Sequence, residues 1–196
     1  MEQSRFEQQM KFLTEIDGLK SIYRQNYLAD GSRRENDVEH SWHLAMMVMV
    51  LAEHFEGLNN LKTIKMVLIH DIVEIYAGDT FAYDEKGYED KEDREQKAAK
   101  RIFSLLPADQ KKEFTALWQE FEEMESQEAL CASFMDRIQP LLMNYSTKGK
   151  MWKEHKVTAD KVRIRNKIVL EKAPACMKEY VDNIIKIAEE KGYFYS

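Results

Sequence analysis

The sequence is most constrained by residues 67–75, an apolar run that a histidine, an aspartate and a glutamate interrupt. A helix that is apolar on every side is expected to be buried on most of its faces. Ionisable groups in such a place cost several kcal/mol unless they are paired or bind a metal. His70 and Asp71 would lie about 100° apart around the helix, with Glu74 one turn further on the same side. The run therefore predicts either a metal site or a buried histidine bonded to a carboxylate, and the pair alone leaves both open.

Helix is the secondary structure that the rest of the chain favours. Prolines and glycines are few, three and seven among 196 residues, and most segments repeat apolar residues at helical spacing. No segment alternates with period two over a useful length, so no strand is expected. The chain is therefore predicted to be one all-α domain, residues 1–196, of roughly seven to nine helices. The helices are expected at residues 6 to about 23, 37–55, 60–77, 92–106, 108–124, from Ser126 onward, 158–171 and 174–190, with Pro140 kinking or interrupting the one after Ser126.

Charge and cysteine content exclude several classes of protein. The net charge of −6 argues against a protein that coats a nucleic-acid polymer. The two cysteines have neither metal-knuckle spacing nor the number for a disulfide framework. The chain starts with a polar stretch and its apolar runs are too short to cross a membrane, so a cytoplasmic protein is expected.

Two further ionisable residues lie in apolar surroundings. His40 comes early in the second predicted helix, beside apolar residues, and Asp136 interrupts a mostly apolar helical stretch. A satisfied core histidine and a structural ion pair are the ordinary explanations, and His43, one turn on, competes with His40 for any ligand role. Together with His70 and Asp71, these residues form a mixed nitrogen and oxygen set that suits a divalent ion and leaves room for water or substrate. Composition alone does not bring the four residues together.

The order of these residues resembles the H…HD…D signature of the HD-domain metal-dependent phosphohydrolases. Residues 33–45 (RRENDVEHSWHLA) resemble the first motif, and residues 70–79 (HDIVEIYAGD) resemble the HDxxE…GD motif. The branch with this extended pattern includes the bacterial 5′-deoxynucleotidases. The resemblance covers residues 19–166, which is most of the chain.

The resemblance implies an HD-domain helical bundle and a role for each matching residue. The implied ligands of one divalent ion (Mn, Co, Fe, Ni, Zn or Mg) are His40, His70, Asp71 and Asp136. Glu74 and Asp79 match the acidic residues that this branch uses for catalysis, and Arg24 matches the arginine that meets substrate phosphate. A further candidate for substrate binding is Arg33, for which a surface position or an ion pair is an equal alternative.

The resemblance implies an enzyme that releases phosphate from a small phosphorylated substrate, namely a nucleoside 5′-monophosphate, deoxynucleotides included. A phosphodiesterase, an alarmone pyrophosphohydrolase and a non-catalytic nucleotide-binding module are the alternatives. Gln25 stands where the deoxynucleotidases have a tryptophan, so the sugar selectivity stays open. The resemblance and the methionines of the second predicted helix, Met46, Met47 and Met49, are compatible with a homodimer, although such a stripe is more often core.

Overall fold

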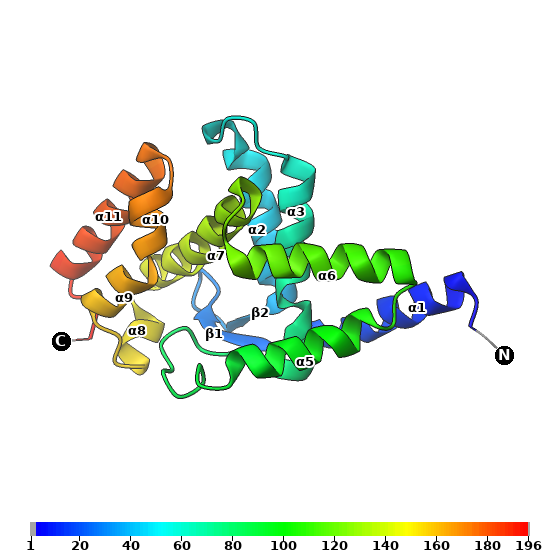
Figure 1. Cartoon of the computed structure of the whole chain (residues 1–196). Helices are drawn as coiled ribbons and strands as arrows, with labels where there is room; N and C mark the ends of the chain where they lie inside the picture. The colour runs from blue at the N-terminus through cyan, green and yellow to red at the C-terminus, as the bar shows by residue number, and fades with distance from the viewer. Residues whose placement is uncertain (1–2, 196) are drawn as a thin grey trace.

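Helices account for nearly all of the regular structure, which confirms the all-α prediction (Figure 1). The structure is a computed structural model that describes residues 3–195. Its α-helices are α1 (Arg5–Glu15), α2 (Asp37–Leu51), α3 (Asn60–Ile69), α4 (Glu74–Ala77), α5 (Lys91–Phe103), α6 (Ala108–Glu123), α7 (Gln127–Ser146), α8 (Lys150–Glu154), α9 (Ala159–Arg165), α10 (Lys167–Lys172) and α11 (Ala175–Glu190).

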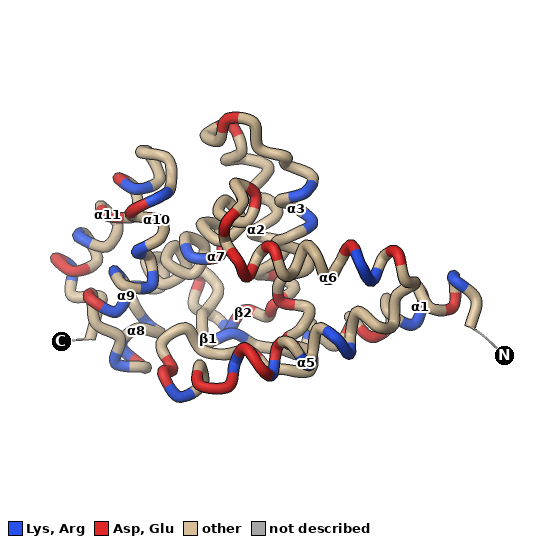
Figure 2. The backbone as a smooth tube through the Cα atoms, in the orientation of Figure 1, with Lys and Arg blue, Asp and Glu red and all other residues tan. Residues whose placement is uncertain are grey.

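The centre of the molecule is formed by α2, α3 and α7, which pack against one another. Each contributes fully buried apolar side chains, such as Leu44 and Val48 from α2, Met66 from α3 and Met135 from α7. Helix α1 lies at one end of the molecule, and the C-terminal helices α9–α11 lie at the other end beside α7 (Figure 1). Acidic and basic residues are interspersed along α5 and α6 (Figure 2).

The helix expected at residues 60–77 changes its winding in the middle. Helix α3 ends at Ile69, a 3-10 segment, η3 (His70–Val73), follows, and α4 continues to Ala77. Gly78 then ends the helical run with φ 78°, a conformation that glycine adopts without steric cost. The tighter 3-10 turn therefore carries His70 and Asp71 and ends directly before Glu74, the first residue of α4.

The expectation that the chain has no strand was wrong. A hairpin pairs β1 (Tyr23–Tyr27) antiparallel with β2 (Arg34–Asn36). Neighbouring side chains of a strand point to opposite faces, and the inward face of β1 carries Arg24 and Asn26 rather than apolar residues. An apolar–polar alternation is therefore missing from the sequence, and the predicted first helix ends at Glu15, followed by a 3-10 turn, η1 (Ile16–Ser21).

Of the two effects expected at Pro140, a kink or an interruption, the interruption does not occur, and one helix boundary differs from expectation. Helix α7 continues through Pro140 without interruption, although a proline removes the backbone donor to the carbonyl four residues earlier, here that of Asp136. The helix expected at residues 158–171 is divided at Asn166 into α9 and α10. Among the described residues, none of the helices combines the length and the apolar character needed to span a bilayer.

Candidate active site

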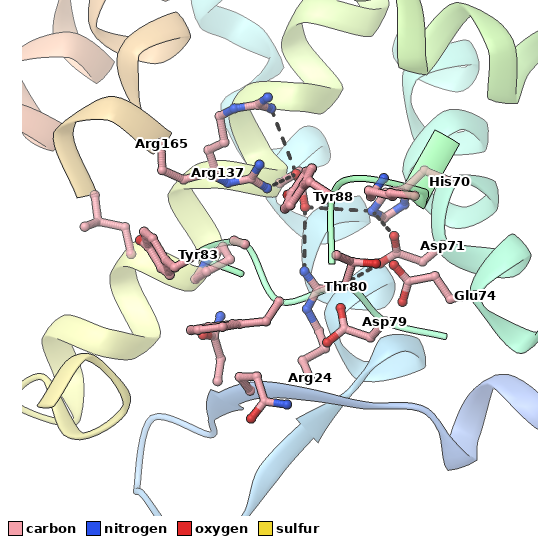
Figure 3. A pocket seen from close by; sticks show the side chains of 18 of the residues that line it. Arg24, His70, Asp71, Glu74, Asp79, Thr80, Tyr83, Tyr88, Arg137 and Arg165 are labelled. Carbon is pink, nitrogen blue, oxygen red and sulfur yellow. Dashed lines mark hydrogen bonds and ion pairs between the residues drawn. The ribbon is translucent and has the colours of Figure 1, made fainter. Parts of the chain in front are cut away.

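The four predicted metal ligands converge from three elements of the fold. Nε2 of His40 lies 3.2 Å from Oδ1 of Asp136, and Nε2 of His70 lies 3.9 Å from the same oxygen. Oδ1 of Asp71 is 3.1 Å from Nε2 of His70. Ligand atoms of His40, His70 and Asp71 all lie within 4.8 Å of one another. The four residues are buried, and Figure 3 shows His70 and Asp71 beside the cavity that they line.

A local signal in the sequence places His40 in the first turn of α2. Asn36 caps this helix by accepting a hydrogen bond from the amide of Glu39, and the Glu39 carboxylate accepts one from the amide of Asn36. This reciprocal arrangement is the capping box that the sequence indicates. The capping box therefore fixes the start of the helix, and the side chain of His40 is fully buried at the centre of the molecule.

Both histidines are oriented by hydrogen bonds on the side away from the cluster. Nδ1 of His40 bonds Oε1 of Gln139 at 3.0 Å, and Nδ1 of His70 bonds the carbonyl oxygen of Val67 at 2.9 Å. Such bonds place the proton on Nδ1 and leave Nε2 as a lone-pair donor. The buried Nε2 of His70 has no hydrogen-bond partner among the described residues. Two inward nitrogen atoms and two carboxylates form a ligand set that fits a divalent ion. His43 lies outside this cluster, where its Nδ1 accepts a hydrogen bond from Nε2 of Gln139.

The two histidines have opposite protonation tendencies when no ion is bound. Burial lowers the pKa of His40 to about 4, so this ring is neutral at pH 7. Burial also lowers the pKa of His70, but the charges of Asp71 and Asp136 outweigh it and raise the pKa to about 9. A metal ion and a proton therefore compete for the same nitrogen of His70.

Glu74 belongs to a second, acidic group beside the first. Carboxylate oxygens of Asp37, Asp71 and Glu74 lie within 4.8 Å of one another. Oδ2 of Asp37 and Oε2 of Glu74 are buried without a hydrogen-bond partner. Burial and the charges of Asp71 and Asp37 raise the pKa of Glu74 well above its ordinary value. Asp79, in the loop after α4, lines the same cavity as Glu74, and burial raises the pKa of Asp79 as well.

Arg24 supplies the positive charge that faces these carboxylates. Its Nη1 lies 2.8 Å from Oδ2 of Asp71 and 3.4 Å from Oδ1 of Asp37, and its Nη2 lies 3.9 Å from Oδ1 of Asp136. The hairpin places it there, because Arg24 is on the inward face of β1 (Figure 3). Arg24 therefore lies directly beside the predicted metal ligands.

Arg33 does not join the cluster. Its side chain is half exposed and pairs with Glu39, Nη1 donating to Oε2 at 2.8 Å. It is absent from the lining of the cavity. The structure thus favours the alternative of a surface ion pair, with Glu39 as the partner.

Three residues of the cluster, His70, Asp71 and Asp136, line a cavity of about 230 Å³, and His40 is buried behind them. Arg137 and Arg165 also line this cavity, although the sequence did not predict them as site residues. Nη2 of Arg165 donates a hydrogen bond to Oδ2 of Asp136 at 3.3 Å. Both arginines are visible above Tyr88 in Figure 3. Further lining residues include aromatic and amide-bearing side chains, among them Phe81, Tyr83, Tyr88, Trp152, Asn26, Asn144 and Asn166, beside the charged residues Lys91, Glu95 and Glu122. None of these belongs to the H…HD…D pattern, so the motif could not reveal them.

The loop between α4 and α5, residues 78–90, covers the cavity and is held by one side chain. Arg94 donates to the carbonyl oxygen of Ala77 at 2.5 Å, to Oγ1 of Thr80 at 3.1 Å and to the carbonyl oxygen of Gly87 at 3.0 Å. Both ends of the loop are therefore attached to the same guanidinium group. This loop carries Asp79.

The fold and the site define a helical protein with a buried His and Asp centre that suits a divalent ion. The model of the HD domain family matches residues 16–177. The chain belongs to the HD domain family.

Known proteins of similar sequence include 5′-deoxynucleotidases. Human 5′-deoxynucleotidase HDDC2 is 32% identical over 134 residues, which are 68% of this chain and 65% of the human protein. The match thus spans slightly less than two thirds of that relative. The Dictyostelium discoideum 5′-deoxynucleotidase HDDC2 is 30% identical over 143 residues, covering 69% of this chain and 75% of its own.

The fold also matches a solved structure over nearly its full length. The crystal structure of a predicted metal-dependent phosphohydrolase from Magnetospirillum magnetotacticum MS-1 has a TM-score of 0.93 and 48% sequence identity, and the match covers 98% of this chain and 97% of the other. A Listeria innocua HD-domain phosphohydrolase, 16% identical with a TM-score of 0.65, covering 92% of this chain and 89% of its own, shares the fold.

Proposed function

We propose that this protein is a metal-dependent phosphomonoesterase that releases phosphate from nucleoside 5′-monophosphates. The observation that carries the proposal is the convergence of His40, His70, Asp71 and Asp136 beside a cavity that three arginines line. The similarity to proteins named 5′-deoxynucleotidase supports the nucleotide as substrate. We propose residues 1–196 as one catalytic unit.

The four ligands would hold one divalent ion, which supplies charge neutralisation at the phosphoryl oxygens and Lewis acidity toward the attacking water. Glu74 would position this water and accept its proton, because its carboxylate is buried next to Asp71 and has an oxygen without a partner. Asp79 lines the same cavity from the covering loop and would orient the water or the leaving group.

Arginines would bind the phosphate group. The guanidinium group is planar and always charged, and it matches the geometry of phosphate oxygens. Arg24 lies on the hairpin side of Asp136, whereas Arg137 and Arg165 lie on the α7 and α9 side. A dianionic phosphate between them would meet positive charge from both sides. Arg33 has no place in this set.

Phosphate release from a panel of ribo- and deoxyribonucleoside 5′-monophosphates tests the proposal. We expect release that stops when the ion is chelated and falls by at least about 100-fold in Glu74→Gln, the size of a general-base contribution. An exposed acid on α6, Glu113, offers the control Glu113→Gln, which should keep full activity. Hydrolysis after a chelator has removed the metal ion, or an unchanged rate in Glu74→Gln, would contradict the mechanism.

The panel also separates the alternatives. Turnover of diesters or of alarmone pyrophosphates, without release from monophosphates, would favour a phosphodiesterase or a pyrophosphohydrolase. Nucleotide binding without any turnover in the presence of metal would favour a binding module. Preference between ribose and deoxyribose would reveal the effect of Gln25, which lines the cavity beside Arg24.

We also propose that the chain forms a homodimer through one face of α2. Trp42 and Met49 are both 62% exposed, and Met46 and Val38 lie on the same stripe at helical spacing, whereas Met47 is buried in the core. A contiguous exposed apolar face is a common mark of an interface. Light scattering after size-exclusion chromatography should give twice the chain mass, and Trp42→Glu should reduce it to the mass of one chain. A monomeric wild type would refute the proposal.

A further inference from the structure

One face of α7 contacts both ring nitrogens of His40. Nε2 of His40 lies 3.2 Å from Oδ1 of Asp136, and Nδ1 of His40 lies 3.0 Å from Oε1 of Gln139. Asp136 and Gln139 are three residues apart, so they share a side of the helix. The side chains of His40 and Gln139 are fully buried, and Asp136 is nearly so. The ring is therefore held between a proposed metal ligand and an amide that has no role in the reaction so far.

The amide of Gln139 has three partners, and all of them agree on one orientation. Its Nε2 donates to Oε1 of Glu35 at 2.7 Å and lies 3.3 Å from Nδ1 of His43. Its Oε1 is the atom that faces His40. A flipped amide would set two oxygen atoms against each other at 2.7 Å from Glu35. Because the partners decide which end of an amide is the oxygen, Glu35 directs Oε1 of Gln139 toward His40.

The hairpin supplies Glu35 to this amide. Glu35 is the middle residue of β2, and it faces inward, whereas its neighbours Arg34 and Asn36 are only half buried. Among the described residues, the bond from Gln139 is the one hydrogen bond that the Glu35 side chain makes. Oε2 of Glu35 lies 3.8 Å from Nδ1 of His40, which is too long for a hydrogen bond. Glu35 therefore reaches His40 through Gln139.

This chain of bonds decides which nitrogen of His40 carries the proton. The amide oxygen of Gln139 can only accept, so Nδ1 of His40 donates and Nε2 keeps its lone pair. That lone pair faces a carboxylate oxygen of Asp136 at 3.2 Å. Two acceptors at this distance repel each other unless a cation lies between them. The opposite tautomer would instead bond Asp136 through a proton on Nε2 and leave no lone pair for an ion.

We propose that Glu35 and Gln139 are positioning residues that hold His40 in its metal-binding tautomer. Gln139 bonds the ring directly, and Glu35 acts on it by orienting the Gln139 amide. The inference rests on the proposed function through its metal site, because it concerns how one ligand of the ion is prepared. It does not depend on which phosphorylated substrate the protein hydrolyses.

Isothermal titration calorimetry of the metal-free, full-length protein with Mn²⁺ tests the assignment. Removing the partner behind a metal-binding histidine typically weakens metal affinity ten- to a hundredfold, so we expect Kd to rise at least about tenfold in Gln139→Met and in Glu35→Met. Glu35→Gln keeps an oxygen that accepts from Gln139 and should retain most of the wild-type affinity. The control Thr63→Val removes a different buried hydrogen bond, from Oγ1 to the carbonyl oxygen of Asn59, and should bind Mn²⁺ as wild type does.

The double variant Glu35→Met/Gln139→Met separates positioning from general damage to the fold. If Glu35 acts through Gln139, its loss has no further effect once Gln139 is gone, so the double variant should bind Mn²⁺ as Gln139→Met does. Effects of the two changes that multiply would overturn the inference. A Glu35→Gln protein that binds as weakly as Glu35→Met would overturn it too.

A measurement on the wild-type protein keeps the inference testable even if no methionine variant folds. Nitrogen-15 NMR of histidine-labelled, metal-free protein shows which ring nitrogen is protonated, and the His40 signals are those missing from His40→Gln. We expect the proton on Nδ1, and a proton on Nε2 would overturn the inference. Failure of the proposed function looks different: wild-type protein would bind Mn²⁺, with the variants weakened as expected, but would release no phosphate from any nucleotide. Wild-type protein that binds no Mn²⁺ would refute both.

Discussion

Arg94 donates a hydrogen bond of 2.5 Å to the carbonyl oxygen of Ala77, and the same guanidinium group bonds Gly87 at 3.0 Å. These two residues stand near the two ends of the loop that covers the cavity. One side chain of α5 thereby closes the loop and determines where its polar residues lie. Asp79 is two residues from the first anchor, so its position relative to the metal cluster depends on this bond.

Replacing Arg94 with alanine is expected to lower kcat about tenfold, because each lost hydrogen bond contributes about 1 kcal/mol and the loop loses several. Arg94 is a positioning residue, so added guanidinium ion should restore part of the rate. Steady-state kinetics with and without this ion provide the measurement. Lys97→Ala changes an exposed side chain of the same helix and serves as the control. An Arg94→Ala rate equal to wild type would show that the loop does not need this anchor.

Adding a divalent ion such as Mn²⁺ should raise the thermal stability of the wild-type protein. An ion at 100 times its Kd stabilises the folded state by about 2.7 kcal/mol, which corresponds to roughly 5–10 °C in Tm for a chain of this size. Asp71→Asn should lose most of this shift, because Asp71 faces both histidines of the cluster. Differential scanning fluorimetry with and without EDTA measures it.

Asp79→Asn is the matched comparison for this measurement. It removes a negative charge from the same cavity but not from the proposed ligand set. The Asp79→Asn protein should therefore keep the metal-dependent shift in Tm while its turnover falls. An equal loss of the shift in both variants would mean that Asp79 also holds the ion.

The sequence predicted those site residues that are ionisable and lie in buried helical stretches. His40, His70, Asp71 and Asp136 attract notice because they interrupt apolar stretches, and the structure brings them together within hydrogen-bonding reach. Burial is a property that apolar periodicity predicts well, so an ionisable group in a buried stretch is visible in the sequence. The helices themselves were predicted for the same reason.

The site residues that could not be predicted from the sequence are polar residues that face inward from short elements. Strand β1 points Arg24 and Asn26 into the cavity, so its inward face is polar and lacks the apolar positions that mark a half-buried strand. Arg165 and Asn166 stand at the junction of two short helices, which a continuous helical pattern conceals. Their importance comes from tertiary packing against α7, and no local pattern encodes that contact.

The two cysteines should differ strongly in reactivity. Both are free; Cys176 is exposed, and Cys131 is buried in the core. Burial raises the pKa of Cys131 to about 12, so almost none of it is the reactive thiolate at pH 8. Titration with a chromogenic disulfide reagent at pH 8 should give one fast equivalent in native protein and two after denaturation. Cys176→Ser should abolish the fast equivalent, and a second fast equivalent in native wild type would contradict the packing around Cys131.

Arg165 and Arg33 should have opposite effects on substrate binding, although both come from polar segments. Arg165 reaches Oδ2 of Asp136 at the edge of the cavity, and charge-assisted hydrogen bonds to phosphate are among the strongest that proteins make. Arg165→Gln is therefore expected to raise KM for a nucleoside monophosphate about tenfold. Arg33→Gln breaks only the surface pair with Glu39, which contributes little, and should leave KM unchanged. Initial-rate kinetics on the two variants decide the point: a raised KM in Arg33→Gln would restore that residue as a substrate ligand, and an unchanged KM in Arg165→Gln would remove Arg165 from the phosphate site.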